Sequence, residues 1–148
     1  MAAEAELRRD YEALDQLGER NFIATVAAVL AEALFRQGKH DEAEAFVARS
    51  VEIAAADDVF TQFLWRQVRA NLLALQGRFV EAIRLANEAV ALSRQSDEPI
   101  SQANTLLDLA QVLMAAGHTA DANDARTRAI DLYDLKGDLV SMAAARDS

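Results

Sequence analysis

Three polar side chains recur at matched places in the chain and could recognise another molecule by hydrogen bonding. Glu32, Asn71 and Gln111 lie 39 and 40 residues apart, and each directly follows an alanine. Amides both donate and accept hydrogen bonds, and a carboxylate accepts them. A row of such groups can bind the backbone or side chains of a partner, although the same residues also fit an ordinary solvated surface.

Two arginines, Arg66 and Arg69, stand where the other units of the chain have apolar residues. Their counterparts are Ala27, Leu30, Leu106 and Leu109. An arginine at such a position must extend along its stem to solvent or meet a carboxylate. We expect a structural staple between units or recognition of a partner's acidic group, with Trp65 beside them as packing or as an interface anchor. The candidate carboxylates within the chain are Glu32, Asp57, Asp58 and Asp108.

The sequence lacks patterns for catalysis or metal binding. It contains no Cys, which excludes disulfides and thiolate chemistry. His40 and His118 are two repeats apart, too far to share a metal ion, and the run from Asp121 to Asp124 lacks the glycine and terminal glutamate of a calcium loop. Phosphate loops, nucleophile elbows and zinc patterns are also absent. We therefore expect no enzyme activity, no catalytic residue, no metal site and no cofactor.

The charge balance narrows the class of partner. The net charge is −9 and the pI is about 4.6, so the surface repels phosphate backbones and disfavours nucleic acid. Basic residues are scattered, without a polybasic stripe for a membrane surface. Because the sequence also lacks a signal-peptide core and a long apolar run, we expect no membrane association and a cytoplasmic location.

Three glycines mark the elements that must position these residues. Gly38, Gly77 and Gly117 are also 39 and 40 residues apart, and each lies between the same two helical patterns. A fixed period of this length is typical of a solenoid of helical hairpins. We expect Asp58, Asp97 and Thr119 to be helix N-caps. Helices are predicted over residues 4–17, 20–37, 41–56, 59–76, 79–94, 97–116, 119–136 and 138–146.

The helices group into one repeat domain over residues 1–148. Each complete unit has a helix A, a glycine turn, a helix B and an acidic connector. Both ends resemble interior pieces rather than caps, so we expect an excerpt of a longer protein; the alternative is a short protein whose end helices act as caps. The predicted parts are a lone helix B (1–18), three complete repeats (19–57, 58–96 and 97–136) and a partial terminal helix (137–148).

The turn region resembles the tetratricopeptide repeat. The second unit carries the likeness with Gly77, Phe79, Ala82, Ala86 and Ala89, while the other units keep the glycine and most of the small residues. The period exceeds the family's usual length, which leaves HEAT and armadillo repeats as alternatives. The resemblance implies an all-α, right-handed solenoid of antiparallel helical hairpins whose A helices line a concave groove. The residues expected in this groove are Glu32, Gln67, Asn71, Asn104, Asp108 and Gln111.

A second likeness is to the C-terminal repeats of large bacterial signalling proteins that join a class III adenylate or guanylate cyclase domain to an AAA-type ATPase. This likeness implies a signalling context, although no cyclase or ATPase motif lies in this chain. The residues that carry it are Asp57, Asp58, Gln62, Trp65, Arg66, Arg69, Ala70, Leu132, Tyr133, Lys136 and Gly137.

These observations favour a non-catalytic interaction or scaffold module that binds a protein or peptide in the groove. The alternative is self-association into a homodimer through exposed apolar end helices, with Leu139, Val140 and Met142 at one end. Sensing of a small ligand by the superhelix is a third hypothesis, which the acidic balance disfavours for anionic metabolites.

Overall fold

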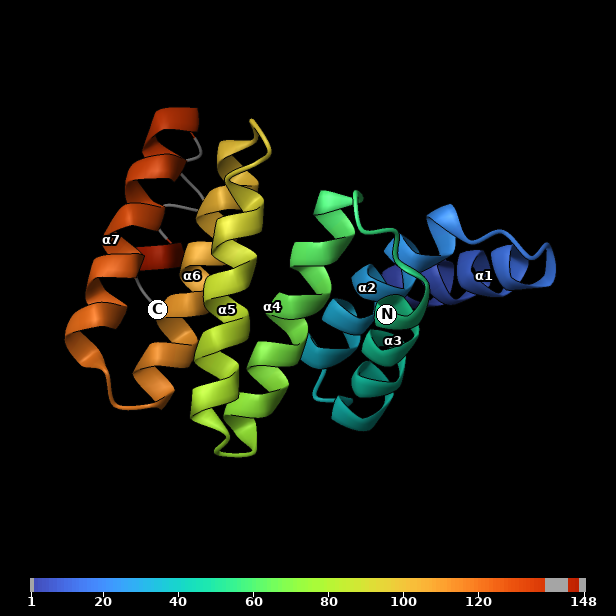
Figure 1. Cartoon of the computed structure of the whole chain (residues 1–148), viewed down its shortest axis with the longest axis horizontal. Coiled ribbons are helices and arrows are strands. Elements are labelled where there is room, and N and C mark those ends of the chain that lie inside the picture. Colours follow the sequence, from blue (N-terminus) through green and yellow to red (C-terminus); the bar gives the residue numbers. More distant parts are fainter. Residues whose placement is uncertain (1, 138–143, 147–148) are drawn as a thin grey trace.

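The computed structural model describes residues 2–137 and 144–146, and this part of the chain contains helices and turns but no strand. Figure 1 shows the helices side by side, from α1 at one end of the molecule to α7 at the other. The helices are α1 (Ala2–Gln16), α2 (Asn21–Arg36), α3 (His40–Ile53), α4 (Val59–Leu75), α5 (Phe79–Ser93), α6 (Pro99–Ala115) and α7 (Thr119–Lys136).

Six of these helices form three hairpins, α2–α3, α4–α5 and α6–α7, and the hairpins stack in chain order (Figure 1). The first helix of each hairpin corresponds to helix A and the second to helix B. The A helices contact one another in sequence, α2 with α4 and α4 with α6, and the B helices α3 and α5 each contact the next A helix. The predicted all-α solenoid of antiparallel hairpins is confirmed.

The glycine turns explain why each A helix ends where it does. Gly77 has φ 76°, a left-handed conformation that favours glycine. Its N–H donates to the Ala74 carbonyl (3.1 Å), and the Arg78 N–H donates to the Leu73 carbonyl (3.0 Å). This is a Schellman motif, which satisfies carbonyls that the helix end leaves free. The turn at Gly38 has the same pair of bonds, so the hairpins share one geometry.

Small residues let helices A and B of each hairpin approach closely. Ala43, Ala82 and Ala122 occupy matched positions on the B helices, and all three are completely buried. A second matched set, Ser50, Ala89 and Ala129, is equally buried. In the first hairpin the Ser50 hydroxyl donates to the Ala24 carbonyl (3.0 Å), so the exception to alanine satisfies its polar group within the core.

The structure confirms one of the three predicted helix N-caps and corrects the other two. Asp58 caps α4 as predicted, because its side chain accepts from the Thr61 N–H (3.2 Å). The predicted cap Asp97 is wrong: Glu98 takes that position and accepts from the Ile100 N–H, since Pro99 begins the helix. The predicted cap Thr119 is also wrong, because the turn that follows the A helix makes His118 the N-cap.

The end of the chain is described in part. Residues 144–146 are helical, and Ala145 is completely buried in the core. The rest of the eighth predicted helix lies outside the described residues. Leu139, Val140 and Met142, the apolar residues predicted for self-association, lie there too.

Candidate functional site

The A helices line one groove of about 590 Å³, which we call the A-helix groove. On α4 its residues include Phe60, Leu64, Gln67 and Asn71, which share one helix face because they are three or four positions apart. The same spacing brings residues of α2 and α6 to the groove from either side. All six residues predicted for a groove line it: Glu32, Gln67, Asn71, Asn104, Asp108 and Gln111.

Apolar lining residues were missed by the sequence interpretation. Phe60 and Phe63 meet edge to face with ring centroids 5.3 Å apart. Phe63 is buried, whereas Phe60 lines the groove with 44% of its surface exposed. The available signal was the helical spacing from Phe60 through Leu64 to Gln67, which places an aromatic residue in line with the predicted polar ones. The other apolar side chains of the groove are Val29, Phe35, Leu64, Val68, Leu107 and, from the last described helical residues, Ala144.

The polar centre of the groove joins two A helices. The Gln67 side-chain amide on α4 donates to the Asp108 carboxylate on α6 over 2.7 Å, and Gln67 itself is only 4% exposed. On α2, the Arg36 guanidinium lies 3.6 Å from the Glu32 carboxylate. The hydrogen bond holds the Asp108 carboxylate against α4, whereas the ion pair joins two partly exposed side chains one turn apart on α2.

Asp108 has an unusual environment for a carboxyl group. Burial raises its pKa to about 7, and the charge of Glu32 acts in the same direction. The hydrogen bond from Gln67, the charge of Arg36 and a hydrogen bond from Asn71 oppose this rise without cancelling it. At neutral pH the groove therefore contains a carboxyl group close to its titration midpoint.

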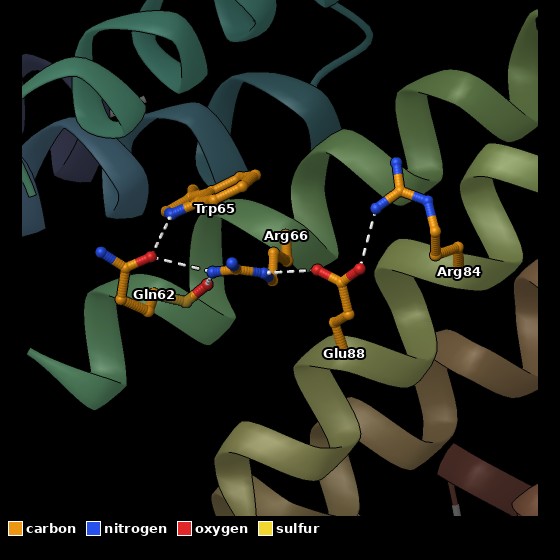
Figure 2. Close-up of polar contacts among 5 residues, drawn as sticks. All are labelled: Gln62, Trp65, Arg66, Arg84 and Glu88. Carbon is orange, nitrogen blue, oxygen red and sulfur yellow. Dashed lines mark hydrogen bonds and ion pairs between the residues drawn. The ribbon is translucent and has the colours of Figure 1, made fainter. Parts of the chain in front are cut away.

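A second cleft of about 500 Å³ lies on the other side of α4, between α3 and α5, and contains the predicted arginine cluster. Figure 2 shows the Arg66 guanidinium between Gln62 and Glu88. Its Nε donates to the Glu88 carboxylate (3.0 Å), and its Nη1 donates to the Gln62 side-chain oxygen (2.8 Å). Arg84, which lies on α5 like Glu88, donates to the other Glu88 oxygen (2.8 Å), so this carboxylate binds two arginines and is linked to α4 through Arg66.

Trp65 and Arg69 complete this cluster. The Trp65 indole N–H donates to the Gln62 side chain (3.0 Å), and the Arg66 guanidinium carbon lies 4.3 Å from the Trp65 ring centroid. Arg69 lies 5.7 Å from the same ring and pairs with Glu44 on α3 at 3.0 Å. The two arginines thus tie α4 to both neighbouring B helices.

The carboxylates predicted as partners of Arg66 and Arg69 were wrong. The four candidates come from the A helices or the acidic connector, whereas both arginines point toward the B helices. The true partners, Glu44 and Glu88, were missed because a period alone does not say which side of helix A a residue faces. The candidates that the structure replaces are Glu32, Asp57, Asp58 and Asp108.

A family model described as tetratricopeptide repeat matches residues 61–134, which are 74 of the 148 residues. The match runs from α4 into α7. The chain belongs to the tetratricopeptide repeat family. No curated protein matches the chain.

Membership of the tetratricopeptide repeat family decides against the HEAT and armadillo alternatives. Tetratricopeptide repeats are non-catalytic modules that generally mediate protein–protein interactions. The first hairpin lies before the matched range, but it keeps the glycine turn at Gly38. The predicted family is thereby confirmed, and the matched range includes α4 and α6 of the A-helix groove, whereas α2 lies before it.

Across residues 2–137 and 144–146, no three His, Cys, Asp or Glu side chains are grouped in a way that could hold a metal ion. In the same part of the chain, no helix is both long enough and apolar enough to cross a bilayer.

Proposed function

We propose that the chain is a protein-interaction module that binds a segment of a partner protein in the A-helix groove. The observation that carries this proposal is the convergence of all six predicted polar residues on one groove, together with apolar and aromatic side chains. Solenoids of stacked repeats use concave surfaces of this kind to bind their partners. Interaction is also the general role of the family.

We further propose that this interaction module acts in a signalling protein. The likeness of the sequence to the repeats of cyclase and ATPase signalling proteins supports this context, and a repeat module there would dock other proteins. The resemblance rests in part on Trp65, Arg66 and Arg69, which lie in the cleft between α3 and α5 instead of lining the groove. The proposed context therefore adds nothing to the choice of groove residues.

The test selects ligands from a displayed library of random peptides. Selected peptides are then measured against the wild-type protein, the Asn71→Arg/Gln111→Arg double variant and the control Val80→Arg. Val80 is 86% exposed on α5 and lines neither the groove nor the cleft on the other side of α4. The arginines fill the groove, so we expect at least about tenfold weaker binding to the double variant, equivalent to about 1.4 kcal/mol, and unchanged binding to the control.

Peptides that bind all three proteins equally would show that the A-helix groove is not the binding site. A selection that yields no peptide above background would count against the proposed function as a whole. Circular dichroism of the double variant shows whether its helices are intact, so that a loss of binding is not mistaken for a loss of fold.

A further inference from the structure

The Asp108 carboxyl group lies at the centre of the A-helix groove, where its printed side-chain hydrogen bond comes from a neutral amide rather than from a cation. Asp108 accepts a hydrogen bond from the neutral Gln67 amide at 2.7 Å. Within the described residues, no Lys or Arg forms an ion pair with Asp108, and Arg36 pairs with Glu32 instead. A partly buried carboxylate without a cation is unfavourable, and an incoming cation would relieve that cost.

We propose that Asp108 receives a basic side chain of the partner, so that the A-helix groove selects an arginine- or lysine-bearing segment with apolar neighbours. This inference rests on the proposed function and adds the chemical class of the partner. An acidic segment would be repelled, because it would place a third negative charge beside Glu32 and Asp108.

The charges around Asp108 support a basic occupant. The titratable groups that line the groove are Glu32 and Arg36 on α2 and Asp108 itself on α6. With both acids ionised, two negative charges and one positive charge give a groove charge of −1. The other polar side chains facing it are neutral: Gln67, Asn71, Ser101, Asn104 and Gln111. The chain as a whole carries −9, so a basic segment is also attracted over a longer range.

An exposed aromatic side chain in the groove supports apolar neighbours for the basic residue of the partner. Phe60 precedes Gln67 by two helical turns, which is about 10 Å along α4. Its exposed ring offers a surface for an apolar side chain or for the flat face of a guanidinium. The polar centre and the aromatic wall therefore suit a segment that carries both kinds of residue.

Proton linkage gives the proposal a second signature. Burial raises the pKa of Asp108 to about 7, and a cation beside the carboxyl group favours its ionised form. Binding of a basic segment thus lowers this pKa and releases a proton. The affinity is expected to rise with pH through about 7, whereas a neutral segment would gain nothing from ionisation.

The experiment uses the groove-dependent peptides from the selection above. For each, the basic residue is replaced by citrulline, which keeps the length of arginine but carries no charge. Affinities are measured between about pH 6 and pH 8 on the wild type, on Asp108→Asn and on the control Asp121→Asn, which removes the same charge from an exposed site on α7. A charge-assisted hydrogen bond is stronger than a neutral one. We therefore expect the affinity to fall by about tenfold or more when citrulline replaces the basic residue of the peptide, and likewise when Asp108→Asn replaces the wild-type protein.

We also expect Asp108→Asn to abolish the rise in affinity with pH and Asp121→Asn to retain it. Three results would overturn the inference while the proposed function stands: groove-dependent peptides without a common basic residue, citrulline peptides that bind as well as their arginine parents, or an Asp108→Asn variant that binds like Asp121→Asn. If no peptide depends on the groove, the inference fails together with the proposed function.

Discussion

Glu88 and Asp108, two carboxyl groups on opposite sides of α4, have pKa values that are shifted in opposite directions. Burial acts to raise the pKa of Glu88, but hydrogen bonds from Arg66 and Arg84 together outweigh it and lower the pKa. Burial also raises the pKa of Asp108, and there the neutral amide of Gln67 does not compensate. The charge of Glu88 is neutralised within the fold, whereas that of Asp108 is left for something else to neutralise.

Helix α4 separates these two environments. Gln67 and Asn71 lie on its groove side, and Arg66 and Arg69 lie on the other side, because each residue turns the helix by about 100°. The arginine side contains ion pairs that connect neighbouring helices, as expected for a structural role. The groove side contains amides and a carboxyl group with unused hydrogen-bonding capacity, as expected for recognition. Stability and binding should therefore respond to mutation on different sides of one helix.

The largest effect should come from Trp65→Ala, which removes a side chain that is only 9% exposed and supports both arginines. Loss of a buried aromatic side chain costs about 3–5 kcal/mol of unfolding free energy. The matched variant Phe60→Ala, on the groove side of α4, should cost about 1 kcal/mol or less because its ring is already half exposed. Urea denaturation measures both. Equal losses would mean that the two sides of α4 do not divide the roles of stability and binding.

The arrangement of helices could be predicted from the sequence because it depends on local signals that repeat. Each glycine allows the left-handed turn, and each alanine allows the close approach, so Gly77 and Ala82 carry their information in their own identity. The groove residues followed from the same period once the family was recognised, since equivalent positions of stacked units face the same way.

The contacts of Arg66 and Arg69 could not be predicted in the same way. Their partners, Glu44 and Glu88, belong to B helices whose rotation relative to α4 is set by packing across the whole stack. The raised pKa of Asp108 has a similar origin, because it depends on burial in the folded chain and on side chains of α2 and α4, and the sequence gives no measure of either. Periodicity assigns a residue to a helix face, but tertiary packing decides what that face meets.

The next largest effect should be a stabilisation by Asp108→Asn that appears only above acidic pH. The unfolded carboxyl group has a pKa of about 4, and in the folded protein burial raises the pKa to about 7. Between these values the folded chain holds a proton that the unfolded chain has lost. Wild-type stability therefore falls as pH rises, by at most about 1.4 kcal/mol per pH unit. Asparagine lacks this penalty.

We expect Asp108→Asn to match the wild type near pH 4 and to exceed its unfolding free energy by about 1–3 kcal/mol near pH 8. Urea titrations across this range test the difference, with Asp121→Asn as the control that should show no such trend. A constant difference at all pH values would mean that Asp108 ionises normally. The pKa values of Asp108 and Glu88 would then not be shifted in opposite directions, and the contrast between the two sides of α4 would fail.

The smallest effect should be the coupling between Arg66 and Glu88, which a double-mutant cycle with alanine isolates. Both side chains are partly exposed, so solvent screening limits the coupling to about 0.5–1 kcal/mol. The matched pair in the groove, Arg36 and Glu32, is longer at 3.6 Å, and its arginine is 75% exposed, so its coupling should be close to zero. Denaturant titrations at low and high salt measure both pairs. A larger coupling for the groove pair would reverse the comparison, because stability would then reside on the side that we assign to binding.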